Sequence, residues 1–286
     1  MEIMKNLSDS FVLANGVKIP CVGFGTWRTP DGEVAVASVK EALKVGYRHI
    51  DTAAAYKNEG SVGKAIKESG IPREEIFVTS KLANPEHGYE STLKAFDKTM
   101  EELGLEYLDL YLIHWPVPVA HRDDWKEATL ATWKAFEKLY KEGRIKAIGV
   151  SNFKVHHLQH LMDNGEIVPM VNQIEFHPSC LREDIVDFCR EHNILVEAWS
   201  PLASGEVFKV EELKDIAEKY NKNVAQLVLR WILQKDILPL PKSVHSDRIK
   251  ANGEIFDFEI TEGDMHLIDQ ISTCKGSGSD PDFINF

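Results

Sequence analysis

The sequence predicts an α/β protein, a (β/α)8 TIM barrel whose bottom is closed by an N-terminal β-hairpin. Apolar runs that read as buried strands alternate along the whole chain with segments in which apolar residues recur at helical spacing. The strand runs are nearly continuous rather than alternating, as expected when helices and a barrel interior cover both faces. The length of 286 residues also suits a barrel, which takes about 250 residues in one domain. We therefore expect residues 1–286 to form a single barrel domain.

The predicted elements follow in order along the chain. A hairpin is expected at about residues 10–20, because two short apolar runs flank Asn15-Gly16, a strong turn signal. Barrel strands are then expected at residues 21–24, 49–52, 76–80, 108–114, 145–150, 170–176, 195–200 and 238–241. Helical spacing is clearest at residues 93–103, 133–140, 185–192 and 224–231. The tail at 274–286 contains glycines and a proline, and we expect it to pack back over the barrel as an irregular segment.

Composition argues against several classes of function. The formal net charge of −12 disfavours nucleic acid or an anionic membrane as a partner, because phosphate binding requires a basic surface. No apolar stretch approaches the roughly 20 residues needed to cross a bilayer, and the first residues lack the apolar core of a secretory signal, so we expect a cytoplasmic protein. The cysteines, at positions 21, 180, 189 and 274, show no CxxC spacing. We therefore expect free thiols and no metal site.

Functional side chains close three consecutive strand runs. Asp51, Lys81 and His114 each end an apolar run that a helical pattern follows, and Tyr56 comes shortly after the first of them. In a parallel barrel the carboxyl ends of the strands share one face, where catalysis takes place. A phenol is a weak acid at neutral pH, but the ammonium of Lys81 would favour the phenolate and lower the pKa of Tyr56. We expect Asp51 to hold Lys81 charged, and His114 to orient a carbonyl group that Tyr56 protonates.

None of these four side chains can donate a hydride, so the chemistry requires a bound cofactor. The chain contains no G-x-G-x-x-G motif, which disfavours a Rossmann site. The usual phosphate site of a barrel, after strands seven and eight, offers Lys242, Ser243 and Arg248 close together in an acidic chain. Such a cluster suits a phosphate monoester, so these residues indicate NADPH/NADP+ rather than NADH.

Several motifs resemble those of the aldo-keto reductases. They are Gly-Tyr-Arg-His-Ile-Asp-Thr-Ala at residues 46–53 with Tyr56, Gly-Val-Ser-Asn-Phe at residues 149–153, and Leu-Pro-Lys-Ser at residues 240–243 with Arg248 and Asn252. The His-Trp-Pro and Val-Asn-Gln sequences at residues 114–116 and 171–173 extend the resemblance over essentially the whole chain. The pattern most resembles the short bacterial members, of the diketogluconate reductase, glyoxal reductase and prostaglandin F synthase-like type.

The resemblance implies a role for each matching residue. The catalytic tetrad would be Asp51, Tyr56, Lys81 and His114, with Tyr56 as proton donor. The cofactor contacts would be Ser151, Asn152 and Gln173 at the nicotinamide carboxamide, Trp199 stacked on the nicotinamide ring, Lys242, Ser243 and Arg248 at the adenosine 2′-phosphate, Asn252 at adenine, and Ser200, Leu202 and Val244 beside them. The substrate pocket would be lined by Trp27, Ala83 and Trp115.

One pocket position departs from the family pattern. Residue 83 is Ala where relatives commonly carry Trp, so the pocket is expected to be wider beside Lys81. The segment 117–125 is longer than in the related chains, and Trp125 could instead fold inward and fill the same space. The sequence leaves both possibilities open.

The favoured function is the reduction of aldehydes, ketones or α-dicarbonyls by NADPH, in a cytoplasmic monomer with no nucleic-acid or membrane partner. An NADPH-binding sensor or structural barrel without significant turnover is the alternative, which an intact tetrad disfavours. A glycosidase would need paired carboxylates, and the only available pair, Asp51 with Glu175, leaves Lys81 unexplained. The histidines at positions 156, 157 and 160 are expected on an exposed helix face without a catalytic role.

Overall fold

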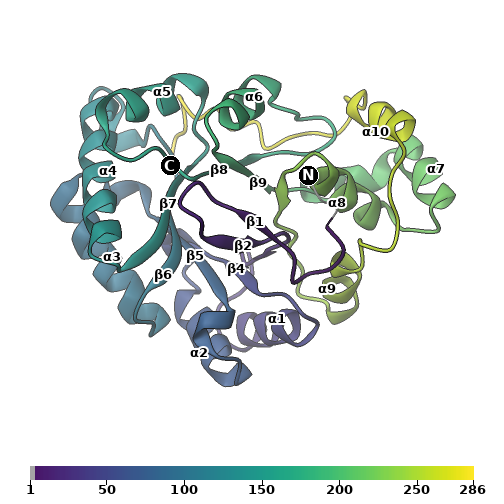
Figure 1. Cartoon of the computed structure of the whole chain (residues 1–286), viewed down its shortest axis with the longest axis horizontal. Helices are drawn as coiled ribbons and strands as arrows, with labels where there is room; N and C mark the ends of the chain where they lie inside the picture. Colours follow the sequence, from purple (N-terminus) through teal and green to yellow (C-terminus); the bar gives the residue numbers. More distant parts are fainter. Residues whose placement is uncertain (1–3) are drawn as a thin grey trace.

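The computed structural model describes residues 4–286, and these contain eight parallel strands that pair in chain order around a barrel (Figure 1). The strands are β3 (Phe24–Gly25), β4 (His49–Asp51), β5 (Phe77–Leu82), β6 (Leu108–Ile113), β7 (Ile145–Ser151), β8 (Val171–Glu175), β9 (Leu195–Trp199) and β10 (Leu238–Pro239). The barrel is closed where the backbone N–H groups of Gly23 and Gly25 donate to the carbonyls of Pro239 and Pro241, at 3.1 and 3.0 Å. The predicted (β/α)8 barrel is confirmed.

The first and last barrel strands are shorter than predicted. The first begins at Phe24 rather than at Cys21, and the last is a two-residue strand. Pro239 and Pro241 have no N–H to donate to a ladder, so this edge of the barrel is held through their carbonyl groups alone. Proline chemistry therefore limits the regular pairing at the closing edge.

The predicted N-terminal hairpin is also present. Strands β1 (Ser10–Val12) and β2 (Lys18–Pro20) are antiparallel, and they lie across one end of the barrel (Figure 1). The side chain of Asn15, in the turn, donates to the carbonyl of Lys146 at 2.9 Å. Because Lys146 stands near the beginning of β7, the hairpin closes the end of the barrel opposite to the carboxyl ends of the strands.

Helices surround the strands, and the segments with predicted helical spacing coincide with α3, α4, α6 and α8. The α-helices are α1 (Glu33–Lys44), α2 (Glu59–Ser69), α3 (Tyr89–Leu103), α4 (Trp125–Lys141), α5 (Val155–Asn164), α6 (Glu183–Glu191), α7 (Glu211–Lys219), α8 (Val224–Gln234), α9 (Ser246–Gly253) and α10 (Glu262–Asp269). Short 3-10 helices are η1 (Ala54–Tyr56), η2 (Arg73–Glu75), η3 (Asn84–Glu86), η4 (Val119–His121) and η5 (Ala203–Lys209). No helix in the described part of the chain has the length and apolar character needed to span a membrane.

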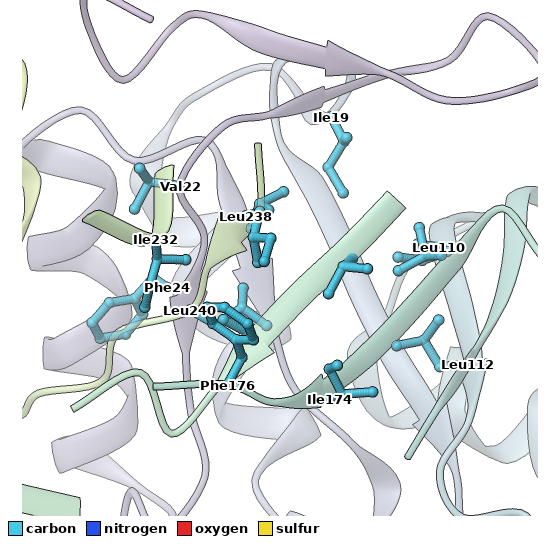
Figure 2. Close-up of a cluster of buried hydrophobic side chains, with 14 of the residues drawn as sticks. Ile19, Val22, Phe24, Leu110, Leu112, Ile174, Phe176, Ile232, Leu238 and Leu240 are labelled. Carbon is cyan, nitrogen blue, oxygen red and sulfur yellow. The ribbon is translucent and has the colours of Figure 1, made fainter. Parts of the chain in front are cut away.

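The barrel interior is apolar toward the hairpin and polar toward the carboxyl ends of the strands. Figure 2 shows Ile19 projecting from the hairpin toward the strands that carry Leu110 and Leu238, and all three side chains are fully buried. At the other end of the strands, Asp51 and Lys81 are buried as well. Burial of charged groups costs free energy unless they are paired, and such departures from apolar packing are expected at functional sites. This polar end of the barrel is therefore the candidate functional site.

Candidate active site

The ammonium group of Lys81 lies at the centre of the site. Its Nζ donates to the two carboxylate oxygens of Asp51 at 2.7 and 2.8 Å, and to the carbonyl of Thr52 at 2.9 Å. Asp51 ends β4 and Lys81 lies on the neighbouring strand β5, so sheet pairing itself brings the two together. Burial alone would lower the pKa of Lys81, but the Asp51 carboxylate raises it above its ordinary value. The lysine is therefore charged.

The Tyr56 hydroxyl accepts a hydrogen bond from Lys81 Nζ at 3.4 Å. We expected the ammonium to lower the pKa of this phenol, and that expectation is wrong for the net effect. Burial raises the pKa of Tyr56, Lys81 lowers it by less, and Asp51 raises it further, so the pKa lies above its ordinary value. The sequence did not show that the hydroxyl is desolvated or that a carboxylate offsets the ammonium. Tyr56 therefore holds its proton until a stronger base, such as an alkoxide, is next to it.

The imidazole of His114 is beside the phenol. His114 directly follows β6, and its ring packs edge-on against Tyr56 with a centroid separation of 5.8 Å. Burial, together with the charge of Lys81, lowers the pKa of His114 to about 3. The ring is therefore neutral at physiological pH and has one N–H to donate. A carbonyl oxygen between His114 and Tyr56 could accept from both groups.

The residues expected to hold the nicotinamide carboxamide lie at the end of β7 and on β8, and Trp199, expected to stack on the nicotinamide ring, ends β9. Asn152 donates from Nδ2 to the His114 carbonyl at 2.9 Å and to Ser151 Oγ at 3.1 Å. Its Oδ1 accepts from Trp199 Nε1 at 2.8 Å. Ser151 Oγ donates to the carbonyl of Gln173 at 2.8 Å. This group is thus joined directly to the backbone of His114, and its role in cofactor binding stays a prediction.

The predicted phosphate cluster contains a further cation that the sequence reasoning missed. Lys242 Nζ donates to the backbone carbonyl of Arg28 at 3.2 Å. Burial and then the Arg28 guanidinium lower the pKa of Lys242, as expected where one positive group lies close to another. Arg28 stacks on Trp27, 4.2 Å from the ring centroid, while Arg248 is exposed on α9. The signal available in the sequence was the position of Arg28, just after the first barrel strand.

The other predicted cofactor residues lie on the same face. Ser200 directly follows β9 and has a positive φ of 51°, and Leu202 comes two residues later. Val244 is exposed just before α9, and Asn252 is buried on that helix. The roles of these four side chains in cofactor binding stay predictions.

The C-terminal segment after α10 packs over the carboxyl ends of the strands, as expected. Ser277 donates from its backbone N–H and its hydroxyl to Glu175, at 2.6 and 2.7 Å. Asp282 accepts from Lys154 Nζ at 2.7 Å and lies 2.8 Å from His157 Nε2. The expectation that His157 is exposed is wrong, because its side chain is fully buried beneath this segment. Its Nδ1 accepts from the Lys154 backbone N–H at 3.1 Å, which leaves Nε2 to carry the ring proton toward Asp282.

The last residue of the chain reaches the predicted substrate pocket. The Phe286 ring packs edge-on against Trp115 with a centroid separation of 5.4 Å. A main-chain oxygen of Phe286 accepts from Nδ2 of Asn84, the residue after Ala83, at 3.3 Å. The alternative in which Trp125 folds inward is wrong, because that residue begins α4 and packs against the histidines of α5, the nearest with a centroid separation of 4.9 Å. The aromatic ring that packs against Trp115 at the predicted pocket thus comes from the C-terminus, and its main chain lies next to Asn84.

The geometry also argues against a glycosidase. Asp51 is bound to Lys81, and Glu175 is bound to the C-terminal segment. Although burial alone would raise the pKa of Glu175, the nearby His177 ring and the hydrogen bonds from Ser277 bring it below its ordinary value. A carboxyl group of this kind is a poor general acid, whereas glycoside hydrolysis needs one with a raised pKa.

Comparison with known proteins places the chain in a family. The model of the aldo/keto reductase family matches residues 21–273. Glyoxal reductase of Bacillus subtilis (strain 168) is 51% identical over 281 residues, which cover 98% of this chain and 99% of the relative. Methylglyoxal reductase DkgA of Escherichia coli (strain K12) is 43% identical over 272 residues, which cover 94% and 96%. A crystal structure of a Gox0644 mutant in complex with NADPH matches with a TM-score of 0.89 at 41% identity, over 97% of this chain and 98% of that chain. The chain belongs to the aldo/keto reductase family, as its motifs indicated.

Proposed function

We propose that the protein is an NADPH-dependent reductase of small carbonyl compounds, which converts aldehydes, some ketones and α-dicarbonyls to alcohols. The observation that carries this proposal is the position of Lys81 Nζ, within hydrogen-bond distance of both Asp51 and the Tyr56 hydroxyl. Two similar proteins are named glyoxal reductase and methylglyoxal reductase, which favours α-dicarbonyls as substrates. We also propose that it acts as a cytoplasmic monomer.

The donor set at the far end of the site fits a phosphate monoester. Arg28 and Lys242 crowd together, and Arg248 follows on α9. Paired cations of this kind are stabilised by an anion, and guanidinium groups bind phosphate oxygens with two parallel hydrogen bonds. We infer that these residues hold the 2′-phosphate of NADPH, while Ser151, Asn152 and Gln173 hold its carboxamide.

Residues of the barrel then orient the substrate carbonyl and deliver a proton to its oxygen. Bound NADPH supplies a hydride to the carbonyl carbon. His114, held neutral, donates a hydrogen bond to the carbonyl oxygen and orients it toward Tyr56. Because Lys81 donates to the phenol oxygen, the hydroxyl hydrogen of Tyr56 is free to point at the substrate. As negative charge develops on the carbonyl oxygen, Tyr56 transfers its proton to that oxygen, and Lys81 stabilises the phenolate that remains.

The proposal is tested by measuring NADPH oxidation with a panel of glyoxal, methylglyoxal, aromatic aldehydes, keto esters and keto sugars. We expect turnover with several members and the highest kcat/KM for an α-dicarbonyl or aldehyde. Binding of NADPH without oxidation by any member of the panel would favour the alternative, a sensor or structural barrel. Size-exclusion chromatography with light scattering tests the monomer.

A further inference from the structure

A second carboxyl group is buried inside the barrel, below the tetrad. Glu197 lies on β9 with no exposed surface. Its register partner on β8 is Gln173, so the two side chains project from adjacent strands at the same level. Glu197 Oε2 accepts from Gln173 Nε2 at 2.7 Å. Carboxyl groups are rarely fully buried, because desolvation is costly, so this one calls for an explanation.

The amide of Gln173 joins this carboxyl group to the tetrad. Gln173 Nε2 donates to Asp51 Oδ2 at 2.8 Å as well as to Glu197. The Asp51 carboxylate can only accept hydrogen bonds. The amide nitrogen of Gln173, with both of its hydrogens, must therefore face Asp51 and Glu197. The amide oxygen makes no hydrogen bond with any residue that the structure describes. It is therefore the atom of Gln173 that is left for a ligand.

The groups around Glu197 keep it neutral. Burial, followed by the charge of Asp51, raises the pKa of Glu197 to about 8, although Lys81 acts in the other direction. The remaining titratable neighbour is His49, whose Nε2 lies 4.0 Å from Glu197 Oε1. Burial lowers the pKa of His49 to about 3, so it brings no positive charge. At neutral pH Glu197 thus adds no second charge beside Asp51, while its carbonyl oxygen still accepts from Gln173.

We propose that Glu197 is a positioning residue, which holds the Gln173 amide with its nitrogen toward the barrel interior and so presents the amide oxygen to the carboxamide N–H of the nicotinamide ring. This inference rests on the proposed function, which places that carboxamide at Gln173. Without an acceptor at position 197, only Asp51 would hold the amide, through one of its two N–H groups. The other N–H would be left unpaired in the barrel, and a rotated amide would turn its oxygen away from the ligand.

The experiment compares NADP+ with its 3-acetylpyridine analogue, in which a methyl group replaces the carboxamide NH2. Dissociation constants for both are measured by tryptophan fluorescence on the wild type, Glu197→Leu, Glu197→Gln and Gln173→Leu. The wild type should prefer NADP+ by about threefold to tenfold, the worth of one hydrogen bond. Glu197→Leu has no acceptor and should lose this preference, as should Gln173→Leu. Glu197→Gln is the matched control, because it keeps an acceptor oxygen but cannot ionise, and it should keep the wild-type ratio.

Thermal unfolding shows which variants are folded, and Glu197→Met replaces Glu197→Leu if the leucine variant is not. A folded apolar variant that keeps the wild-type preference would overturn the inference. So would loss of the preference in Glu197→Gln, because an acceptor would then not be sufficient. Retention of the preference by Gln173→Leu would show that Gln173 does not contact the carboxamide, and this result would also overturn the inference. A wild type that binds no NADP+ would instead contradict the proposed function itself.

Discussion

Removing the C-terminal Phe286 tests which side chain closes the proposed substrate pocket beside Ala83. Phe286 is 59% exposed, so roughly two-fifths of the residue is covered, and its ring packs against Trp115. A fully buried aromatic side chain covers about 150–250 Å2, so this contact covers on the order of 60–100 Å2. At about 25 cal/mol per Å2, the ring contributes roughly 1.5–2.5 kcal/mol to docking of the chain end. The contact of Phe286 with Trp115 therefore contributes a modest free energy, which one deletion removes.

We expect the deletion to raise kcat/KM for an aryl ketone by about tenfold, since one pocket contact is worth about 1–3 kcal/mol. Methylglyoxal is too small to use the vacated space, and its kcat/KM should change by less than about threefold. Ala83→Trp introduces an indole on the same side of the proposed pocket. In the shortened chain it should reverse the gain for the aryl ketone, and in the full chain it should lower kcat/KM for bulky ketones by about tenfold or more through overpacking.

The assay is NADPH oxidation with one α-dicarbonyl and one aryl ketone. Phe283→Ala is the matched control, because Phe283 lies on the same segment and is 72% exposed, and it should leave both substrates unchanged. An equal loss for both substrates on deletion would mean that Phe286 docks the whole segment rather than shaping the pocket. No change for the aryl ketone would refute its role as a wall.

Three further predictions concern the proton, the cofactor and pH. Tyr56→Phe should lower kcat by about 100-fold or more with nearly unchanged NADPH affinity, and a variant with near wild-type turnover would remove this residue as the acid. Arg248→Ala should weaken NADPH binding by roughly 1.5–3 kcal/mol and barely affect NADH, whereas equal weakening of both would show that it does not bind the 2′-phosphate. The pKa of Glu197, about 8, lies above the unfolded value of about 4.3, so the stability that its proton contributes is lost as pH rises toward 8. Glu197→Gln should therefore gain in melting temperature relative to the wild type between pH 5 and 8, and a constant difference would contradict the raised pKa.

The sequence was sufficient to predict the barrel and the meeting of the tetrad. Strand runs at nearly regular intervals imply parallel pairing, and parallel pairing puts the ends of β4, β5 and β6 on one face. Asp51, Lys81 and His114 each end such a run, so their proximity follows from topology without any knowledge of side-chain packing. Motif positions in a barrel are informative because the fold, rather than local sequence, brings them together.

Other features depended on packing that periodicity does not reveal. The predicted direction of the Tyr56 pKa shift was wrong, because burial of the hydroxyl depends on the whole surrounding structure. Phe286 lies in a segment without regular spacing, so nothing in the sequence indicated that it reaches Trp115. Arg28 stands beside Lys242 only because the barrel closes between its first and last strands. Contacts between distant segments that lie in irregular loops cannot be predicted from sequence periodicity and are seen only in the three-dimensional structure.

At the polar end of the barrel, buried charged and acidic side chains that the proposed chemistry needs stand where apolar side chains would stabilise the fold as well or better. Barrel interiors are ordinarily filled by branched apolar side chains, as the layer around Ile19 is. Asp51, Lys81 and Glu197 occupy equivalent interior space, although apolar replacements of buried ion pairs are often neutral or stabilising. The arrangement is tolerated because each charge or acid has a partner, and Gln173 serves two of them at once. Polar residues inside otherwise apolar strand runs are thus a conflict between local sequence and core packing, and in this chain that conflict marks the proposed active site.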